Sequence, residues 1–362
     1  MPRPDVDLII AVHSAERPIE RAVRSVLDTT GADVRVTVVC HRIDASVIEA
    51  RLGTAAADPR MRLVEHHDSF RSPSGPFNRG MDLADARFTS IMGSDDELEP
   101  GAIDSWLHRA RRDRADMVIP RLRFSSGRVV SSPPVRPFRV QRLDGLRDRL
   151  AYRSAPLGLV SRERFGDVRL EEGMRNGGDI AFVTRLWFAD AARSFDRRGP
   201  AYVINDDATD RVTFAPKPIA VELEWLARLL ARTETRELPS PVRLALARKF
   251  ARVHVFGAVF NRRDAPGWLQ DDRAALVRAI EGLRAFAPGF ETSLSRVDHR
   301  LAAAIVAEDP SEAELVRLAT IRRRPTSWST LTAPTLRGSF ARDAPFRLTL
   351  ASFLVGRSTP RA

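Results

Sequence analysis

Short apolar runs alternate with amphipathic segments along the first two hundred residues of the chain. Val6–Val12 is an apolar run, and apolar residues recur at helical spacing from Ile19 to Leu27, after the cap-like Ser14-Ala15-Glu16. The same alternation continues to about residue 205. This order predicts βαβ units and a mainly parallel sheet, which binds ligands at the carboxyl ends of its strands.

The expected elements of this part follow from the apolar period and the turn signals. Strands are expected at Val6–Val12, Val34–Val39, Arg62–Glu65, Phe88–Met92, Met117–Pro120, Leu122–Phe124 and Ala201–Asn205. Helices are expected at Ile43–Leu52, Asn78–Ala86, Pro100–Arg112 and Asp179–Phe188. Ser125-Ser126-Gly127 predicts a hairpin turn that returns through Arg128–Val130, and residues 155–165 predict a strand and a helix start.

The pattern becomes helical throughout after Thr213. Apolar residues three and four apart, with prolines between the segments, predict helices at Ile219–Leu230, Val242–Val259, Arg273–Phe286, Val297–Val306 and Glu312–Ile321. We therefore expect an α/β domain at residues 1–215, an α-helical domain at 216–320, and a basic tail with an amphipathic segment at 321–362. No internal repeat is visible.

Length and composition set limits on the class of protein. A chain of 362 residues is longer than one average domain, and 43% hydrophobic residues are enough for packed cores. No apolar stretch approaches the roughly 20 residues of a spanning helix, and the first one, Leu8–Val12, is short and follows Asp5 and Asp7. The single cysteine, Cys40, fits a reducing compartment, so we expect a cytoplasmic protein.

Positive charge is concentrated at the end of the chain. Residues 321–362 contain eight arginines and one acid, Asp343, which gives +7 of the net charge of +11. Such a cluster attracts an anionic membrane surface or nucleic acid. The apolar stretch FRLTLASFLVG with its flanking arginines favours a membrane interface, so no nucleic acid is expected. The alternative is an arginine-rich composition without a role, since Lys217 and Lys249 are the only lysines.

One short acidic stretch is the first candidate for chemistry. In SIMGSDDELEP, residues 90–100, the acids Asp95, Asp96, Glu97 and Glu99 follow a buried strand. They would emerge at the ligand-binding edge of the sheet, where carboxylates with substrate phosphates suit Mg²⁺ or Mn²⁺. The alternative is that these acids only stabilise the N-terminus of the next helix.

Three stretches together resemble family 2 glycosyltransferases. PDVDLIIAVHSAERPIERAVRSVL is similar to the opening strand, loop and helix of that family. GPFNRGMDLADARFTSIMGSDDELEPGAIDSW resembles its Asn-x-Gly helix, central strand and DxD-type metal loop. NGGDIAFVTRLWFADAARSFDRRGPAYVI is similar to the segment in which the catalytic base begins a helix. The resemblance covers roughly residues 5–215, and the helical remainder resembles no family that we can name.

This resemblance implies a GT-A fold, a Rossmann-like domain with a mainly parallel central sheet. It implies transfer of a sugar from a nucleotide-sugar to an acceptor hydroxyl with inversion. Asp95 falls on the last acid of the metal loop and, with Asp96, would hold Mg²⁺ or Mn²⁺. Asp179 falls on the general base. Nucleotide-sugar binding is expected at Val12, His13, Glu16, His41, Asn78, Ser94 and Asp95.

The chemistry of such a transfer requires these groups. Breaking the sugar–phosphate bond builds negative charge on the diphosphate, which a metal held by Asp95 would neutralise. A carboxylate such as Asp179 must take the proton of the acceptor hydroxyl. Gly177 and Gly178 leave the backbone before Asp179 free to bend, and the apolar face of the following helix anchors it. The alternative for Asp179 is a helix cap.

The chain departs from the family pattern at four positions. Gly93 stands where the first acid of the metal loop is usual, and Cys40-His41 stands where an acid reads the base. Phe77 replaces a common arginine, and Gly178 replaces a common glutamate. These changes leave the nucleotide and the need for metal undecided.

Other polar residues have a weaker case. Asp206, Asp207 and Asp210 are candidates for a second metal ligand. Arg79, Arg185 and Arg211 are candidates for phosphate contacts, but the favoured alternative for each is a solvated or ion-paired side chain. His66 and His67 are expected on a loop surface. No glycine-rich phosphate loop, zinc-type Cys/His spacing or nucleophile-elbow serine supports another enzyme class.

We therefore expect an inverting glycosyltransferase of surface polysaccharide or cell-wall glycan synthesis, with a glycan or lipid-linked acceptor. Residues 321–362 would place it on the inner face of an anionic membrane, and the helical region offers a surface for an oligomer. The alternative is a non-catalytic module that binds a nucleotide-sugar or a glycan through a degenerate GT-A site. The donor sugar, the base and the acceptor are left open, because a fold does not determine substrates.

Overall fold

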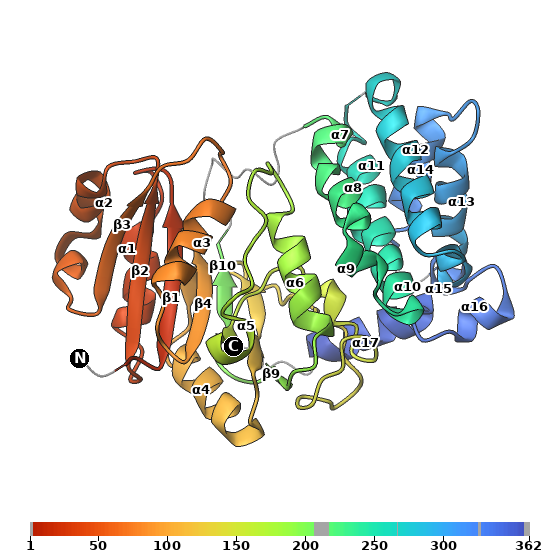
Figure 1. The fold of residues 1–362 in the computed structure, drawn as a ribbon. Helices are drawn as coiled ribbons and strands as arrows, with labels where there is room; N and C mark the ends of the chain where they lie inside the picture. Colours follow the sequence, from red (N-terminus) through yellow and green to blue (C-terminus); the bar gives the residue numbers. More distant parts are fainter. Residues whose placement is uncertain (1–2, 206–216, 266, 325–326, 358–362) are drawn as a thin grey trace.

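A seven-stranded mixed sheet lies at the centre of the N-terminal part of the structure, a computed structural model that describes residues 3–205, 217–265, 267–324 and 327–357 (Figure 1). The strand order is β3-β2-β1-β4-β8-β6-β9. The first four of these strands are parallel, β8 is antiparallel to both neighbours, and β9 is parallel to β6. The strands are β1 (Val6–Val12), β2 (Val34–His41), β3 (Met61–His66), β4 (Phe88–Gly93), β6 (Met117–Pro120), β8 (Leu159–Ser161) and β9 (Arg193–Asp196).

Helices cover both faces of this sheet. Leu8 and Ile10 of β1 share an apolar core with α1 (Ile19–Leu27), α2 (Ala45–Leu52) and α4 (Ala102–Asp113). Ile9 points to the opposite face, where α3 (Ser74–Leu83) and α6 (Gly178–Phe188) pack. Because both faces are buried, β1 is apolar at nearly every position rather than at alternate ones. Shorter helices complete this part: η1 (Gly53–Ala57), η2 (Leu150–Tyr152) and α5 (Arg162–Phe165).

A small second sheet connects the acidic loop to a segment far along the chain. Its order is β5-β10-β7, with β5 (Glu97–Leu98), β10 (Tyr202–Ile204) and β7 (Leu122–Phe124). β10 pairs antiparallel with β5, so Tyr202 lies opposite Leu98 and Val203 opposite Glu97. This pairing brings Tyr202 and its neighbours next to the loop that carries the candidate metal ligands.

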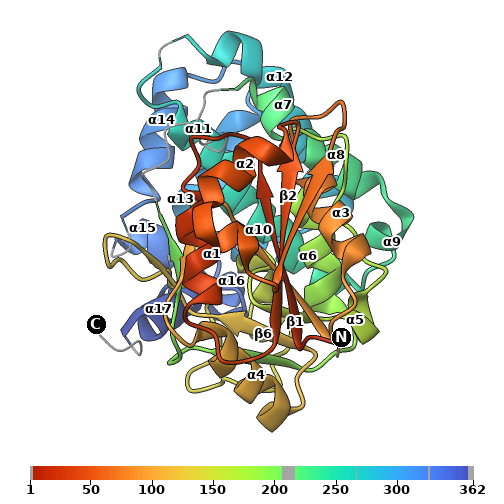
Figure 2. The same ribbon diagram turned by 90° about the vertical axis from the view of Figure 1, so that its left-hand side faces the viewer.

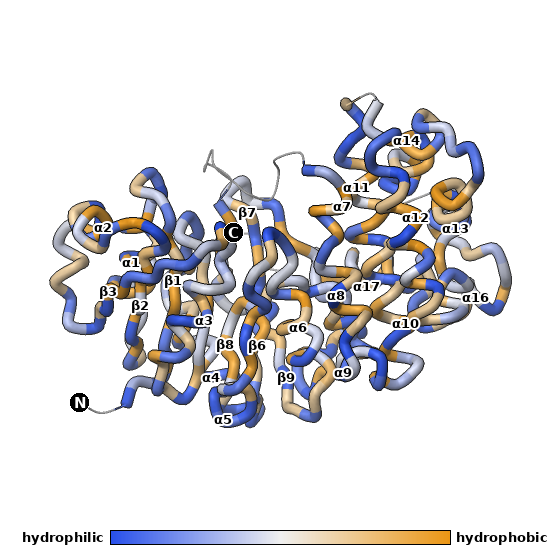
Figure 3. Tube along the Cα trace, turned by 45° about the horizontal axis from the view of Figure 1, so that its top comes forward, coloured by the Kyte–Doolittle hydropathy of each residue, from blue (hydrophilic) through white to orange (hydrophobic). Residues whose placement is uncertain are grey.

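The helical part packs directly on the N-terminal part. Its core includes Met174 and Ile180, which come from the segment before α6 and from α6 itself, so the two parts share one apolar cluster. Figure 3 shows hydrophobic residues recurring along these helices between hydrophilic ones. The helices are α7 (Ile219–Glu222), α8 (Glu224–Ala231), α9 (Thr233–Arg236), α10 (Ser240–Lys249), the π-helical η3 (Phe250–Val255), α11 (Phe256–Asn261), α12 (Leu269–Phe286), η4 (Phe290–Ser293), α13 (Arg296–Ile305) and α14 (Glu312–Ile321).

The end of the described chain returns to the N-terminal part. It forms α15 (Trp328–Leu331), α16 (Leu336–Phe340) and α17 (Pro345–Arg357). Val355 is buried in the core on the α3 and α6 face of the sheet, and Arg149 donates a hydrogen bond of 2.9 Å to the carbonyl of Arg342. Asp343 pairs with Arg248 of α10 at 3.0 Å. The segment from Arg342 to Arg357 therefore contacts both parts. Among the described residues, no helix has the length and apolarity needed to cross a membrane.

The expected fold class is confirmed, and most elements occur where they were expected. Several details differ. α3 begins at Ser74 rather than at Asn78, and the helix expected over Ile219–Leu230 is divided at Leu223 into α7 and α8. The return strand expected at Arg128–Val130 is reduced to a single bridge between Arg123 and Val129. The boundary expected at residues 215 and 216 falls within 206–216, outside the described residues, and stays a prediction.

β9 was missed because its sequence, RSFD, has charged residues at both ends. Both charges are buried in the structure. Arg193 donates to the carbonyls of Leu186 and Ala189, and Asp196 accepts from Ser105 at 2.6 Å and from Arg109 at 3.1 Å. A hydrophobicity pattern cannot show partners that come from α4 and α6.

Replacing Gly80 by alanine tests the packing of α3 on β1. A Cβ at Gly80 would collide with the buried side chain of Ile9, whereas a Cβ at Gly257 in α11 would meet no atom within 4 Å. We expect Gly80→Ala to lower the free energy of unfolding by about 1–3 kcal/mol despite the better helix propensity of alanine. Gly257→Ala, the matched control, should be neutral or stabilise by up to about 1 kcal/mol. Equilibrium unfolding in urea measures both, and a Gly80→Ala protein as stable as the wild type would contradict the packing.

Candidate functional site

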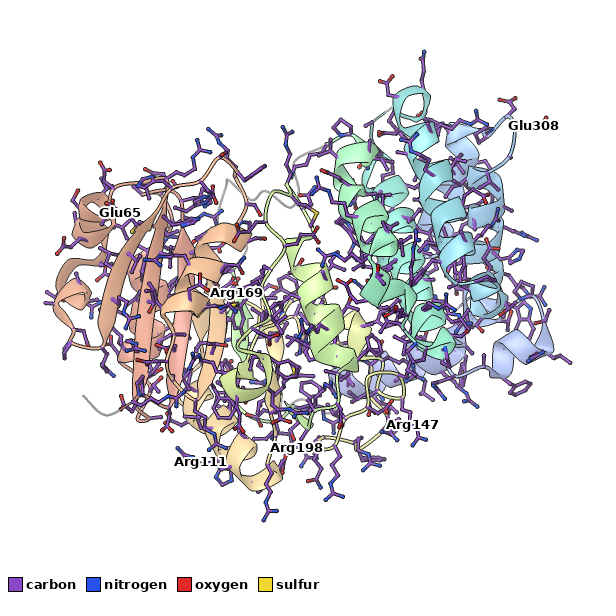
Figure 4. The ribbon with its side chains drawn as sticks, viewed as in Figure 1. Glu65, Arg111, Arg147, Arg169, Arg198 and Glu308 are labelled. Atoms are coloured by element: carbon purple, nitrogen blue, oxygen red, sulfur yellow. The ribbon has the colours of Figure 1, made fainter. Side chains whose placement is uncertain are left out.

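Four parallel strands end at one edge of the sheet, the upper edge in Figure 2. Val12 is in register with Cys40, Ala11 with Gly93, and His41 with His66. The loops after β1, β2, β3 and β4 therefore start side by side. Glu65, near the end of β3, marks the same edge in Figure 4.

Asp95 lies in the loop after β4 and is ion-paired with the region before α1. Nη1 of Arg17 lies 2.8 Å from Oδ2 of Asp95, and the two side chains are only 8% and 13% exposed. Arg21, in α1, donates a hydrogen bond of 2.7 Å to the backbone carbonyl of Asp95. The expected metal ligand is thus next to two fixed positive charges at the strand ends.

Asp96 is held by residues at and after β10. The Tyr202 hydroxyl donates to Oδ2 of Asp96 at 2.6 Å, and the backbone N–H of Asn205 donates to Oδ1 of Asp96 at 3.2 Å. The same hydroxyl accepts from the Gly93 amide at 3.0 Å. Burial, and to a smaller extent the negative charge of Asp96, raises the pKa of Tyr202 well above its ordinary value. The phenol therefore stays protonated and can donate a hydrogen bond.

The other two acids of the stretch have structural partners. Glu99 accepts from Arg121 at 2.9 Å, from Arg123 at 2.5 Å and from the Ala201 amide at 2.6 Å. Glu97 accepts from the Asn205 side chain at 2.9 Å. These contacts connect the loop to β7 and to the residues around β10, and they leave Asp95 and Asp96 as the candidates for ligand binding.

The donor set here is small for a metal ion. Among the residues that the structure describes, no group of three or more His, Cys, Asp or Glu side chains is arranged to bind one. Oxygens of both candidate carboxylates nevertheless lie on the same side of Gly93: a Cβ there would be 3.1 Å from Asp95 and 2.7 Å from Asp96. One or two carboxylates suffice for Mg²⁺ when substrate phosphates supply the remaining ligands. The residues fit a metal that binds together with a diphosphate.

A second polar cluster lies at the ends of β2 and β3. Asp68 bridges two histidines, with Oδ1 at 2.9 Å from Nε2 of His41 and Oδ2 at 3.1 Å from Nε2 of His66. Burial raises the pKa of Asp68, but the hydrogen bonds from His41, the Phe70 amide and His66 outweigh it and keep the pKa below its ordinary value. His66 was expected on a loop surface; it ends β3 and is part of this cluster instead.

Asn78 of α3 is buried, and its amide holds the segment before α6. Its Nδ2 donates to the Leu170 carbonyl at 2.9 Å and to Glu172 at 2.7 Å, and its Oδ1 accepts from the Leu170 amide at 2.9 Å. These bonds occupy the amide group. Nucleotide-sugar binding at Asn78 stays a prediction, and the bonds in the structure give its side chain a positioning contact.

Asp179 lies in the first turn of α6, after a tight glycine pair. Gly177 has φ +73°, which favours glycine, and a Cβ there would lie 2.5 Å from the ring of Trp225 in α8. A Cβ at Gly178 would collide with the side chain of Ser74, at the start of α3. The loop is therefore enclosed between the two parts of the protein. Lys217 also holds it, through a 2.9 Å hydrogen bond to Asn176.

The helical part places a buried lysine near this carboxylate. Lys249, at the end of α10, is 1% exposed, and its Nζ lies 2.8 Å from Nε2 of His254. The ring of His254 packs edge-on against Trp225, with 4.7 Å between centroids. Burial lowers the pKa of His254 well below its ordinary value, and Lys249 lowers it further, so this histidine is neutral.

Asp179 and Lys249 influence each other's ionisation. Burial raises the pKa of Asp179 above its ordinary value, and the charge of Lys249 lowers it in part. Burial lowers the pKa of Lys249 to about 8, and Asp179 raises it in part. Part of the Asp179 residue remains exposed to solvent, although protein surrounds its carboxyl group on most sides. A carboxylate with a raised pKa, in a residue that is itself partly exposed, is suited to accept a proton.

The remaining expected ligands differ in exposure. Val12 and Ser94 are buried, and the side chain of Val12 belongs to the core beneath α1, so only its backbone can face a ligand. His13 and Glu16 are exposed in the loop after β1. Asp206, Asp207, Asp210 and Arg211 lie outside the described residues.

Comparison with known proteins identifies the N-terminal part. Residues 7–168 match glycosyl transferase family 2. They form a family 2 glycosyltransferase domain. Over 119 residues the chain is 33% identical to the succinoglycan biosynthesis protein ExoO of Rhizobium meliloti strain 1021; the matched segment is 33% of this chain and 33% of ExoO. The similarity thus spans about a third of that relative.

Solved structures resemble nearly the whole chain. Residues 1–349 of S. aureus TarS superpose with a TM-score of 0.66 at 14% identity, over 90% of this chain and 93% of that one. The same TarS fragment in complex with UDP-GlcNAc gives a TM-score of 0.65 at 15% identity, over 88% and 92% of the two chains. At this identity the likeness shows the fold. It confirms the GT-A fold and extends to most of the helical region, where no resemblance was expected.

Several site residues were missed from the sequence. Asp68 follows β3 as Asp95 follows β4, so the strand-end rule would have identified it. Arg17 lies one residue beyond Glu16, an expected nucleotide-sugar contact in the loop after β1. Lys249 is a lone lysine within an apolar helical segment, which is a recognisable signal of a buried charge. Nothing in the sequence indicates that Tyr202 contacts Asp96.

Proposed function

We propose that the protein is an inverting glycosyltransferase that moves a sugar from a nucleotide-sugar to an acceptor hydroxyl in polysaccharide or cell-wall glycan synthesis. The family 2 domain and the similarity to ExoO support this reaction class and this setting. The TarS complex with UDP-GlcNAc supports a nucleotide-sugar as donor. The observation that carries the proposal is the placement of two different carboxylate environments at the ligand-binding edge: an arginine-paired loop at Asp95 and a partly desolvated Asp179.

The loop after β4 would bind the diphosphate of the donor. Asp95, with Asp96 beside it, would hold Mg²⁺ or Mn²⁺, which supplies Lewis-acid neutralisation of the leaving group. Arg17 and Arg21 already place positive charge at this loop. Guanidinium groups suit phosphate oxygens through paired hydrogen bonds, so these arginines would bind the diphosphate when Asp95 turns to the cation.

The pair of His41 and Asp68 would border the nucleoside. It lies after β2 and β3, the strands beside β1, where the resemblance places the reader of the base. A carboxylate fixed by two histidines keeps its charge and its orientation. Asp68 would thereby take the part of the acid that is missing at Cys40-His41.

Asp179 would act as the general base. Its carboxylate would accept the proton of the acceptor hydroxyl while that oxygen attacks the anomeric carbon from the side opposite the leaving diphosphate. A raised pKa makes the carboxylate a stronger proton acceptor, and the charge of Lys249 limits how far burial raises that pKa. The contact of Trp225 with Gly177 would fix the direction of the carboxylate.

A non-catalytic binding module is the second candidate. Gly93 and His41 favour it, because the usual acids are absent at both positions. Tight binding of nucleotide-sugars without turnover on any acceptor would support this module and overturn the enzyme.

Asp95→Ala tests the diphosphate site. We expect the affinity for a UDP- or GDP-sugar in the presence of Mn²⁺ to fall strongly, and kcat/KM to fall by about 10²–10³, since a charge-stabilising group is lost. Calorimetry with and without Mn²⁺, followed by a donor-hydrolysis assay, measures both. Asp28→Ala removes a half-exposed aspartate that pairs with Arg24 and should leave both values unchanged. Retention of Mn²⁺-dependent binding in Asp95→Ala would refute this assignment.

Asp179→Asn tests the base separately from donor binding. Turnover with acceptor should fall by about 10²–10⁴ while the donor dissociation constant stays within about twofold, because only proton transfer is removed. Asp167→Asn is the matched control. The Asp167 side chain is 67% exposed and pairs with Arg185, which lies on α6 together with Asp179. An Asp179→Asn enzyme with normal turnover would show that the base is another group.

Lys249→Met tests the electrostatic link from the helical part. The active form of the base is the carboxylate, so activity is lost on the acidic side as pH falls through the pKa of Asp179. Removing a positive charge that lowers this pKa moves the acidic limb of the kcat/KM profile to higher pH. Lys217→Met removes the other lysine at this loop and should leave the limb in place, although loop geometry will change. If the acidic side of the kcat/KM profile stays at the same pH in Lys249→Met, the proposed electrostatic effect of Lys249 on Asp179 is contradicted.

A further inference from the structure

Large exposed hydrophobic side chains are concentrated in the last three described helices. Ten such side chains are exposed among the described residues, and six of them lie between residues 328 and 353. On α17, Phe346, Leu350 and Phe353 are 54%, 43% and 50% exposed. Their spacing of four and three residues puts them on one face of the helix. The others are Trp328 on α15 and Leu336 and Phe340 on α16, which are 72–80% exposed.

The opposite face of α17 is fixed to the protein. Ala351 and Val355 are buried, and Val355 lies in the core of the sheet-containing part. A Cβ at Gly356 would lie 2.7 Å from the Ser131 hydroxyl. The exposed face is therefore held outward by packing on its other side, and it is a fixed surface of the folded protein.

Positive charge surrounds this apolar face. Arg337, Arg342, Arg347 and Arg357 are all exposed, and none of them forms an ion pair with a described residue. The single acid of the segment, Asp343, is buried and neutralised by Arg248 at 3.0 Å. The surface of α16 and α17 thus presents apolar groups and arginines, with no acid of its own segment among them.

We propose that this surface, formed by residues 328–357, docks the protein on a membrane that contains anionic lipid. Aromatic and leucine side chains enter the interface between headgroups and acyl chains, and the arginines contact the lipid phosphates. The charge argues against a second copy of the chain as the occupant, because a symmetric contact would bring two arginine clusters together. An anionic lipid surface is complementary to both features at once.

The docking surface and the candidate site are on different sides of the molecule. α17 and the described end of the chain lie low at one margin of Figure 2, whereas the strand ends face upward. A docked protein would keep its donor site open to solvent. This arrangement suits an acceptor whose hydroxyl extends away from the lipid surface. It suits an acceptor hydroxyl within the headgroup layer less well.

Vesicle sedimentation of the full chain tests the proposal without any assay of activity. The wild type should pellet with vesicles of phosphatidylcholine and 30% phosphatidylglycerol and not with phosphatidylcholine alone, and 0.5 M NaCl should weaken the binding. Phe346→Ser with Phe353→Ser should reduce apparent affinity for anionic vesicles by about tenfold or more. Substitution of Arg337, Arg347 and Arg357 by glutamine should reduce it at least as much.

Two control variants match these changes in charge and exposure. Arg51, Arg198 and Arg300 are exposed arginines on other surfaces, and their triple glutamine variant carries the same change in net charge. Arg198 extends from the lower end of the sheet-containing part in Figure 4. Val47→Ser with Val253→Ser removes two exposed apolar side chains elsewhere. Both controls should bind as the wild type does, and circular dichroism melts check that all variants fold.

Either of two results would overturn the proposal. The first is that the wild type fails to bind anionic vesicles, or that the surface variants bind these vesicles as tightly as the wild type does. The second is self-association of the wild type without lipid that Phe346→Ser with Phe353→Ser abolishes, with no vesicle binding. That result would assign the surface to a second copy. Analytical ultracentrifugation over a range of concentrations distinguishes it.

Discussion

The enclosure of one glycine pair between two packing surfaces determines the geometry of the candidate site. Gly177 contacts Trp225 of the helical part, and Gly178 contacts Ser74 of the sheet-containing part. Any side chain at either glycine would separate the two parts, because interiors are packed without spare volume. The direction of Asp179 therefore depends on both parts at once. The helical region is accordingly a component of the candidate active site rather than an appendage.

Much of the architecture follows from local patterns, and the site follows only in part. Apolar and turn signals predict the strands β1, β6 and β7 at their observed bounds, because these strands are short runs flanked by turn residues. The strand-end rule predicts where Asp95 emerges. The same rules fail where polar groups are buried with partners distant in sequence. β9 is the example within the fold, since Arg193 and Asp196 are stabilised by contacts that only the folded chain provides.

The partners of the predicted carboxylates also could not be predicted from the sequence. Sequence position identifies Asp95, Asp96 and Asp179, but their ionisation and orientation depend on Arg17, Tyr202 and Lys249. Each of these contacts spans a large separation along the chain. Lys249 comes from the region that resembled no known family, and its buried charge acts on the one residue that the resemblance assigns as base. Chemistry that a family resemblance assigns can thus depend on a part of the chain that the resemblance does not cover.

Gly93 is explained by the same packing argument. Where the family pattern has a first acid, a Cβ would lie 2.7 Å from a carboxylate oxygen of Asp96 and 3.1 Å from one of Asp95. A third carboxylate could not be placed there without displacing the other two and adding like charge. The Tyr202 hydroxyl instead joins the Gly93 amide to Asp96 with one neutral group. The departure at Gly93 therefore keeps two carboxylates close together at low electrostatic cost, which is compatible with a metal loop rather than with its loss.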